Sequence, residues 1–166
     1  MILRGRAWKF GDGISTDHIQ PSKYTYLRGD LEQLAKHVME GAREDFPKLI
    51  APGDFIVAGR NFGLGSSREH APTIIKLAGL SAVLAKSFAR IFFRNAINVG
   101  LPLVICDTDQ IEEGDEIEVD LQGGTVNNKS RDIQISFSPL PPFMVRILDS
   151  GGLLQYLEAH GDLLIE

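Results

Sequence analysis

The segment GRNFGLGSSREHAP, residues 59–72, concentrates side chains that could perform acid–base chemistry or bind an anion. Ser66 and Ser67 supply two adjacent hydroxyls, and Arg68 follows them directly. An apolar strand pattern precedes the segment, and an amphipathic helix pattern follows it. Because the amides at the start of a helix, together with the helix dipole, favour negative charge, such a junction can bind an anion. We therefore interpret these residues as a candidate anion-binding catalytic loop.

A purely structural role for this loop is the alternative. Ser66 to Glu69 have the pattern of a capping box, in which Ser66 is the N-cap and Glu69 bonds back to the Ser66 amide. Such a cap contributes about 1 kcal/mol, but it leaves the second serine and the arginine unexplained. Common templates do not decide the question, because the Walker lysine and the third glycine of a dinucleotide fingerprint are absent. The loop does not fit the G-x-S-x-G nucleophile elbow either.

The elements that must position this loop alternate between strand and helix. Four strands are predicted, at residues 4–10, 54–59, 81–88 and 102–106, and the one at 54–59 is a continuous apolar run typical of a buried strand. Apolar residues at three- and four-residue spacing predict three helices, at residues 30–40, 71–77 and 89–100. Residues 15–29 have no clear period, and we expect an ordered loop there. The alternation favours a parallel core sheet with right-handed crossovers.

The pattern changes in the last third of the chain. Residues 115–121 alternate as a half-exposed strand, and residues 123–137 predict turns with one or two further strands in an antiparallel meander. The end predicts two short helices separated by Gly151-Gly152, with Gly161 as a stop. We therefore expect a mixed α/β fold over residues 1–166 as a single domain, with parallel core strands and a β-rich antiparallel extension.

Composition limits the classes of partner. The 166 residues carry a net charge of −5 without any basic tract, which argues against a nucleic-acid ligand. No window reaches the apolar length that spans a bilayer, and the N-terminus has no secretory signal pattern. We therefore expect a cytoplasmic protein that binds neither nucleic acid nor membrane.

The single cysteine, Cys106, restricts metal and redox chemistry. One cysteine can form neither an internal disulfide nor an all-cysteine iron–sulfur site within this chain. Cys106 lies in an apolar strand pattern, which is typical of a core residue. The histidines have no ligand-like spacing, so we expect no metal bound by this chain.

Four segments together resemble a known family: GRNFGLGSSREHAP, WKFGDGISTDHIQPSKY, AKSFARIFFRNAINVGLPLV and GGLLQYLEAHGDL. They are similar to the swivelling domain of aconitase-like hydro-lyases, and the resemblance covers nearly the whole chain. In two-subunit enzymes of this kind the domain is a separate small protein, as in the small subunit of 3-isopropylmalate dehydratase. The resemblance implies the β/β/α swivelling-domain fold.

The resemblance also implies an activity. A small hydroxy-dicarboxylic acid is dehydrated and rehydrated, and a [4Fe–4S] cluster held by three cysteines belongs to a large partner subunit. We expect the chain to serve isomerisation of 2-isopropylmalate and 3-isopropylmalate in leucine biosynthesis, and to be active only with that partner. Alternatives are a homoaconitase or a dimethylmalate/citramalate-type dehydratase, or a non-catalytic anion-binding regulatory module. Without its partner the chain could associate with itself.

By match to the family motif, Ser66 is the expected base that removes a proton next to a carboxylate. Ser67 is expected to hydrogen-bond this base or the substrate. Arg68 is expected to hold a substrate carboxylate, since a planar guanidinium binds a carboxylate through two parallel bonds. A serine is a weak base at neutral pH, so it needs nearby amides and a cation to stabilise its anion.

The segment YLRG, residues 26–29, matches the family's specificity loop. Arg28 is expected at the variable end of the substrate, although by itself it is typical of an exposed loop arginine. Tyr26 and Leu27 could contact an isopropyl group, whereas Arg28 could contact a third carboxylate. The loop therefore does not distinguish an apolar substrate branch from a charged one.

The remaining expected substrate-binding residues are Gly65 and Asn61 of the loop and His18 of the segment TDHI. A loop histidine bonded to a neighbouring carboxylate is the alternative for His18. Arg90 and Arg94 could lie at the carboxyl ends of the strands, where open α/β sheets bind ligands, but surface positions are the simpler prediction.

Overall fold

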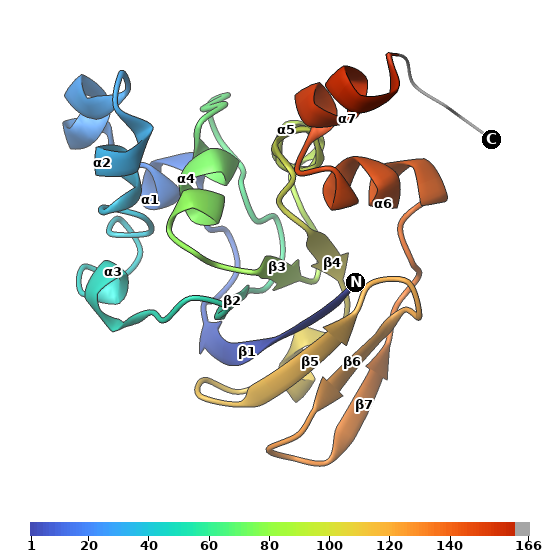
Figure 1. The fold of residues 1–166 in the computed structure, drawn as a ribbon. Coiled ribbons are helices and arrows are strands. Elements are labelled where there is room, and N and C mark those ends of the chain that lie inside the picture. The colour runs from blue at the N-terminus through green and yellow to red at the C-terminus, as the bar shows by residue number, and fades with distance from the viewer. Residues whose placement is uncertain (162–166) are drawn as a thin grey trace.

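Seven strands form one sheet in a computed structural model of the chain, which describes residues 1–161 (Figure 1). The strand order is β4-β3-β2-β1-β5-β6-β7, in which β1 to β4 run parallel and β5 to β7 antiparallel. The predicted mixed sheet is thereby confirmed. The strands are β1 (Ile2–Lys9), β2 (Phe55–Val57), β3 (Ala82–Ala85), β4 (Leu103–Ile105), β5 (Glu116–Asp120), β6 (Thr125–Asn128) and β7 (Ile133–Ser136).

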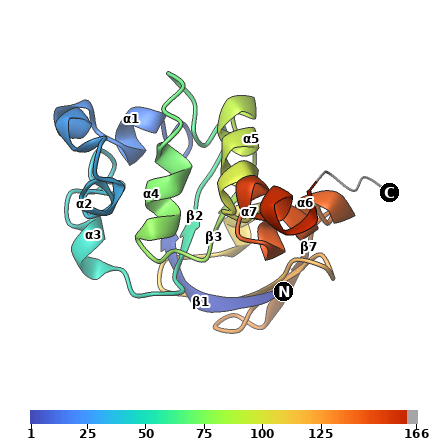
Figure 2. The same ribbon diagram turned by 45° about the horizontal axis from the view of Figure 1, so that its top comes forward.

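The described helices gather above the parallel strands (Figures 1 and 2). The α-helices are α1 (Thr16–Ile19), α2 (Leu31–Ala35), α3 (Phe46–Leu49), α4 (Ala71–Leu77), α5 (Arg90–Val99), α6 (Pro142–Asp149) and α7 (Leu153–His160). Two 3-10 helices are η1 (Ser22–Leu27) and η2 (Thr108–Gln110). The ordered loop expected over 15–29 is instead mostly helical, because α1 and η1 occupy most of it.

The helix predicted over 30–40 is also shorter than expected, since α2 ends at Ala35. The chain turns so that Met39, with φ of 61°, is fully buried. The Met39 amide donates to the Ile19 carbonyl at 2.9 Å, a contact that a continuing helix could not make. A tertiary hydrogen bond therefore overrides the helical periodicity here.

Strand β1 joins the two halves of the sheet. Its residues 2–6 pair antiparallel with β5, and its residues 7–9 pair parallel with β2. Gly5 lies where the chain passes close to Gly53, since a Cβ on Gly5 would stand 2.1 Å from the Gly53 carbonyl oxygen. Glycine is therefore required at this crossing of two backbones.

Alternation along the parallel strands separates two apolar cores. On β2 and the residue after it, Ile56 and Ala58 face the cluster beneath the helices, while Phe55 and Val57 face the opposite cluster. The second cluster also contains apolar residues of β5, β6 and β7, so it lies between the two halves of the sheet. Cys106 belongs to this cluster and is buried, which confirms the core position predicted for it.

Helices α6 and α7 pack against α5 and form a third, smaller cluster. The Lys76 ammonium donates to the carbonyls of Val99 and Gly151, both at 2.9 Å, and so links α4 to this group. The predicted helix pair and its Gly161 stop are confirmed, because Gly161 has φ of 74° at the end of α7. The last two residues of GGLLQYLEAHGDL lie outside the described residues.

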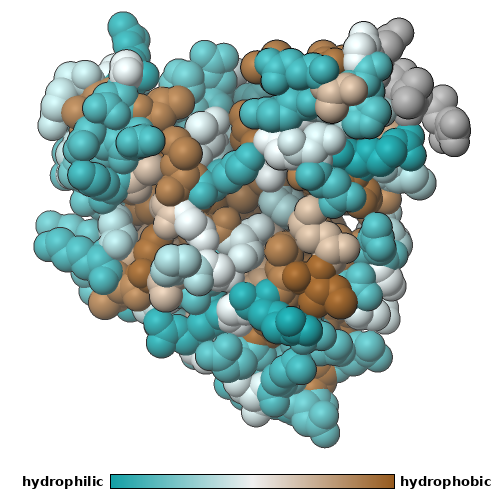
Figure 3. Space-filling view, viewed as in Figure 1, coloured by the Kyte–Doolittle hydropathy of each residue, from teal (hydrophilic) through white to brown (hydrophobic). Residues whose placement is uncertain are grey.

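The surface of the antiparallel extension is mostly hydrophilic on the face that Figure 3 shows. This agrees with β5, where Ile117 and Val119 are buried and Glu116 is exposed. Among the described helices, none is long and apolar enough to cross a membrane.

Candidate active site

The motif loop joins two segments that are distant from it in the sequence. The Gly63 amide donates to the Ile14 carbonyl at 2.7 Å, which ties the loop to the segment after β1. The Phe62 amide donates to the Ser87 carbonyl at 3.1 Å, which ties it to the segment after β3. In both ribbon views the loop rises between α1 and α5 (Figures 1 and 2). The site therefore lies at the carboxyl ends of parallel strands, where such sheets bind ligands.

Two glycines make this course of the loop possible. Gly63 and Gly65 have φ of 86° and 104°, values that residues with a side chain rarely adopt. A Cβ on Gly63 would lie 2.2 Å from the ring of Phe92, so the loop packs directly against α5. The glycines thus allow close approach of the loop to the helix.

The capping-box interpretation of Ser66 and Glu69 is wrong. Helix α4 begins at Ala71, with His70 at the N-cap and no side-chain capping bond. Instead, the Ser66 carbonyl accepts the Arg68 amide and the Thr16 hydroxyl, both at 2.8 Å. These bonds close a turn ahead of the helix, so the Ser66 hydroxyl does not serve as a cap.

A concave pocket of about 220 Å³ lies between this turn and the first turn of α5. It is smaller than the roughly 300–1,000 Å³ of typical ligand pockets. Four predicted site residues line it: Gly65, Ser66, Ser67 and Arg68. The other lining residues are Thr16, Gly63, Ala89, Arg90, Ile91, Phe92 and Asn95.

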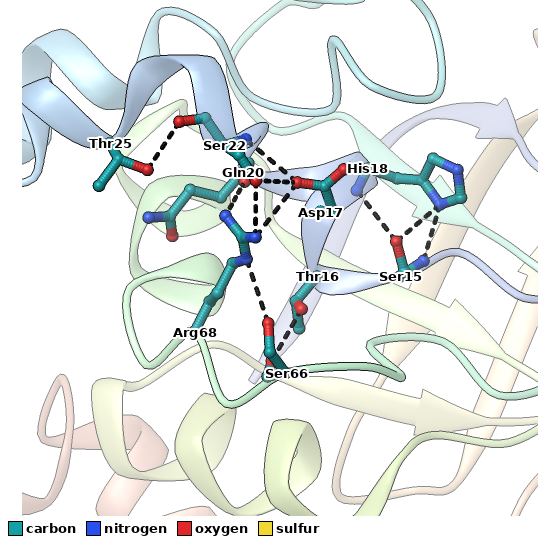
Figure 4. Close-up of polar contacts among 9 residues, drawn as sticks. All are labelled: Ser15, Thr16, Asp17, His18, Gln20, Ser22, Thr25, Ser66 and Arg68. Atoms are coloured by element: carbon teal, nitrogen blue, oxygen red, sulfur yellow. Dashed lines mark hydrogen bonds and ion pairs between the residues drawn. The ribbon is translucent and has the colours of Figure 1, made fainter.

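The guanidinium of Arg68 connects the base candidate to the start of η1 (Figure 4). Its Nε donates to Ser66 Oγ at a long 3.4 Å. One terminal nitrogen donates to the Gln20 carbonyl at 3.0 Å, and the other donates to Ser22 Oγ at 2.9 Å and pairs with Asp17 at 3.2 Å. Arg68 is therefore held in place by groups of this chain.

Asp17 is the anionic partner in this network. The Ser22 hydroxyl donates to its carboxylate at 2.7 Å, and this bond is the main reason that the pKa of Asp17 lies below its ordinary value of 3.8. The Ser22 amide bond and the charge of Arg68 lower this pKa further. Asp17 is therefore ionised at neutral pH and balances part of the charge of Arg68.

The helix end at the pocket is not the one that the sequence predicted. Helix α4 starts beyond the serines, whereas α5 begins at the pocket with Ala89 as an N-cap that makes no side-chain bond. The first amides of a helix have no acceptor within the helix, and they carry its partial positive charge. The positive helix end expected beside Ser66 thus comes from α5, across the pocket.

His18 has a structural role in α1. Its ring Nδ1 lies 2.9 Å from the Ser15 amide, and its own amide donates to Ser15 Oγ at 3.1 Å. These two bonds form a capping box that begins α1. His18 does not line the pocket, but the helix that it caps carries Thr16 and Asp17.

The other predicted substrate-binding residues also lie outside the pocket lining. Tyr26 is 76% exposed, Leu27 packs against the main core, and Arg28 is exposed at the end of η1. Asn61 has φ of 57°, and its amide donates to Ser87 Oγ. The contacts of these four residues with substrate stay predictions.

Sequence reasoning missed Thr16, Ile91 and Asn95 as pocket residues, and it favoured a surface position for Arg90. Thr16 lies on α1, and the other three lie on α5. No local pattern identifies them, because their place depends on how the two helices flank the loop. The glycine at position 63 was the one local sign that another element packs closely against the loop.

The side chains of the described residues are not grouped as the ligands of an iron–sulfur cluster or a metal ion. Among residues 1–161, no three or more His, Cys, Asp or Glu side chains are grouped to hold a metal ion. Burial raises the pKa of the Cys106 thiol to about 12, so this sulfur stays protonated, whereas a metal ligand must be a thiolate.

Comparison with known proteins places this chain and its fold in one class. A family model described as the aconitase C-terminal domain matches residues 10–108. A crystal structure of 3-isopropylmalate dehydratase from Methanocaldococcus jannaschii superposes with a TM-score of 0.92 at 49% identity, covering 97% of this chain and 96% of that one.

The names of individual relatives define a narrower class of protein than the family model does. The chain is 62% identical to "3-isopropylmalate dehydratase small subunit 2" of Archaeoglobus fulgidus, over 99% of this chain and 100% of the relative. It is 52% identical to "Isopropylmalate/citramalate isomerase small subunit" of M. jannaschii, over 95% of this chain and 94% of the relative. The chain belongs to the aconitase C-terminal domain family and, within it, to the 3-isopropylmalate dehydratase small subunits. The resemblance found in the sequence is confirmed.

Proposed function

We propose that this chain is the small subunit of a two-subunit hydro-lyase that interconverts 2-isopropylmalate and 3-isopropylmalate in leucine biosynthesis. The observation that carries the proposal is the open pocket in which the Ser66 hydroxyl meets the Arg68 guanidinium, in a chain so similar to named small subunits. Residues 1–166 would then act together as one swivelling domain.

Ser66 is the proposed base. In the dehydration, a proton leaves the carbon next to a carboxylate, a carbon–carbon double bond forms, and the hydroxyl on the neighbouring carbon departs as hydroxide, which becomes water by taking one proton from solvent. The Ser66 alkoxide accepts the proton that leaves carbon, and in rehydration it returns that proton. Its weak basicity is offset by the Arg68 Nε and by the positive end of α5, which both favour the alkoxide.

Substrate binding is the proposed role of the neighbouring groups. Ser67 and the backbone at Gly65 line the pocket beside the base, where they can donate to a carboxylate. The segment with Tyr26, Leu27 and Arg28 would contact the variable end of the substrate in the assembled enzyme. Ser22 connects this segment to Arg68, because it belongs to η1 and accepts a bond from the guanidinium.

A large partner subunit is required by this proposal. The pocket on this chain is smaller than most ligand pockets, and the partner would complete its enclosure. We also assign the [4Fe–4S] cluster to that partner, since the buried Cys106 thiol does not suit iron ligation. The hydroxyl of the substrate would then contact the partner subunit, while Ser66 would accept the proton from the neighbouring carbon.

Citramalate is the second candidate substrate. The printed name of the M. jannaschii relative includes citramalate beside isopropylmalate, and that protein aligns with 95% of this chain. Both acids carry a hydroxyl and two carboxylates, and they differ in an apolar branch. The isopropyl and methyl branches differ by two carbons, and an apolar pocket distinguishes each methylene by only about 1–3 kcal/mol, so one site could accept both with a preference for one of them.

Reconstitution tests the proposal. The full chain is combined anaerobically with a large subunit whose cluster has been verified by its absorption spectrum. Isopropylmalate, citramalate, dimethylmalate and homocitrate are then supplied one at a time. We expect turnover of isopropylmalate by the mixture and by neither subunit alone. If a verified large subunit that binds the chain turns over none of these acids, the chain is better explained as a non-catalytic anion-binding module.

A further inference from the structure

The turn that follows α2, residues 36–41, lies outside the pocket and has a strained backbone. Met39 in this turn is fully buried with φ of 61°, a conformation that residues with a side chain rarely adopt. Such a conformation persists only where the surrounding structure holds it, and it is often found at functional sites. The turn places His37 and Glu40 against Tyr24 of η1, the 3-10 helix that carries part of the expected specificity segment.

Tyr24, His37 and Glu40 form a closed group of contacts, which we call the Tyr24 cluster. The rings of Tyr24 and His37 are stacked, with centroids 3.8 Å apart and planes inclined by 14°. The Tyr24 hydroxyl donates a hydrogen bond to the Glu40 carboxylate. Nδ1 of His37 lies 3.1 Å from Oε1 of the same carboxylate. The carboxylate therefore joins both faces of the contact between the turn and η1.

The bond between Tyr24 and Glu40 carries a full negative charge. Burial alone would raise the pKa of Glu40, but the hydrogen bonds from Tyr24 and His37 outweigh it and hold this pKa below its ordinary value of 4.5. The same bond raises the pKa of Tyr24 to about 12. At neutral pH a protonated phenol therefore donates to an ionised carboxylate. Bonds of this kind are about twice as strong as bonds between neutral groups.

The two ends of η1 are held by different contacts. At its start, the amide and the hydroxyl of Ser22 both donate to the Asp17 carboxylate, at 3.1 and 2.7 Å (Figure 4). Near its end, Tyr26 is exposed, whereas Leu27 packs against the main core. Tyr24 lies between these two ends. The position of the end of η1 thus depends on Leu27 and on the Tyr24 cluster.

We propose that His37 and Glu40 are positioning residues for the substrate, because through Tyr24 they fix the end of η1 and with it residues 26–28. This inference rests on the proposed function, in which residues 26–28 contact the variable end of the hydroxy acid. His37 and Glu40 touch neither the substrate nor the base. Since Asp17 holds the start of η1 separately, loss of the Tyr24 cluster disturbs the specificity segment more than the base.

The kinetic test uses the assembled enzyme at saturating large subunit. Y24F keeps the stacked ring and loses the hydroxyl, and E40A removes the acceptor. E40Q is the conservative variant, because an amide oxygen can still accept the bond. Y156F is the matched control: Tyr156 also stacks on a histidine, with centroids 4.4 Å apart, but it lies in α7 and packs in the small cluster with α5 and α6.

We expect Y24F and E40A each to raise the KM for isopropylmalate by about 3- to 10-fold, with kcat within about twofold of the wild type. The preference for isopropylmalate over citramalate should fall, because the larger branch loses more contact when the segment moves. E40Q should recover part of the loss, and Y156F should stay within about twofold of the wild type.

The double variant Y24F/E40A distinguishes one shared bond from two separate effects. Both single variants break the same hydrogen bond, so the KM of the double variant should lie within about twofold of the larger single effect. Effects that multiply in the double variant would contradict the proposal. An unchanged KM in both Y24F and E40A would also overturn it.

Amide hydrogen exchange of the full chain alone, followed residue by residue by NMR, separates this proposal from the proposed function. The amides of Arg28 and Asp30 donate to the carbonyls of Thr25 and Leu27, at 3.1 and 2.8 Å. Their exchange should be about 5- to 20-fold faster in Y24F and E40A, and unchanged in Y156F. If the wild-type mixture is inactive while exchange changes in this way, the hold on η1 is supported and the proposed function alone fails. Exchange that is equal in all variants contradicts the role of the Tyr24 cluster.

Discussion

The Nε atom of Arg68 lies 3.4 Å from Oγ of Ser66, and the same guanidinium pairs with a carboxylate on its other side. The hydroxyl therefore has a cation in a fixed position beside it, because three further contacts hold the guanidinium of Arg68 in place. A 3.4 Å hydrogen bond is long, and it can shorten as charge develops on the oxygen. The arrangement suits a serine that must act as a base.

Replacing Ser66 with alanine should remove the proton acceptor at little cost in stability. We expect kcat of the assembled enzyme to fall by about 10²- to 10⁴-fold or more. The side chain is exposed, so the free energy of unfolding should change by less than about 0.5 kcal/mol. The matched control is Ser138→Ala, at an exposed serine after β7. Kinetics and urea unfolding test both parts, and retained turnover in the S66A variant would contradict the assignment.

Replacing Arg68 with glutamine should change the pH dependence of the reaction. A nearby cation lowers the pKa of the group that must lose its proton, so removal of the charge raises this pKa. The rise of kcat with pH should therefore move to higher pH in R68Q, and kcat at neutral pH should fall by about 10²-fold. Arg60→Gln, at an exposed residue of the same loop, is the control. A profile identical to that of the wild type would show that Arg68 does not act on the base.

Replacing Gly63 with alanine should destabilise the fold. Its φ of 86° costs an L-residue about 1–2 kcal/mol, and the clash with the Phe92 ring adds about 1–3 kcal/mol. We expect a loss of about 2–5 kcal/mol in the free energy of unfolding. Gly29→Ala is the control, because a Cβ there meets nothing within 4 Å. Equal unfolding midpoints for the two variants would be incompatible with this packing.

Asp115 should make stability depend on pH in the acid range. Burial pulls the pKa of its carboxyl upward, but this is outweighed by hydrogen bonds from the Glu112 amide, Asn128 and Arg131. The pKa therefore lies below 3.8 in the folded chain. Stability from this carboxylate is fully present above about pH 4 and is lost as the pH falls through the lowered value.

Asp115→Asn should accordingly be less stable than the wild type at pH 7, and the difference should shrink below about pH 4. Chemical unfolding followed at several pH values measures this difference. The exposed Asp149→Asn is the control and should follow the wild type throughout. A constant gap between D115N and the wild type from pH 7 to pH 3 would rule out this origin of the acid sensitivity.

Several elements were predictable because their signals are local. The three parallel strands of the core beyond β1 are continuous apolar runs, and helix α4 occupies 71–77 as its periodicity indicated. The helical break at Gly151-Gly152 also follows from residue type, since both glycines have positive φ. In such segments, short-range preference and tertiary packing favour the same conformation.

Other elements were decided by contacts across the molecule. The helix predicted over 30–40 stops at Ala35, because the Met39 amide bonds to Ile19 in α1. The capping box predicted at Ser66 is replaced by a turn, because Thr16 donates to the Ser66 carbonyl. Each of these bonds joins two segments that are distant in the sequence. No sequence pattern indicates that the two segments lie close together in space.

The sequence alone determined which residues carry the chemistry: two serines and an arginine after a glycine-lined turn, together with the family that they identify. The tertiary structure decided how those groups are used. It brought the end of α1 to Arg68 and the start of α5 to the far wall of the pocket, and so added Asp17 and Arg90 to the site. The reason is physical: a residue's type and its near neighbours fix what its side chain can do. The sheet places three distant segments at one edge, and this placement determines which groups each side chain contacts.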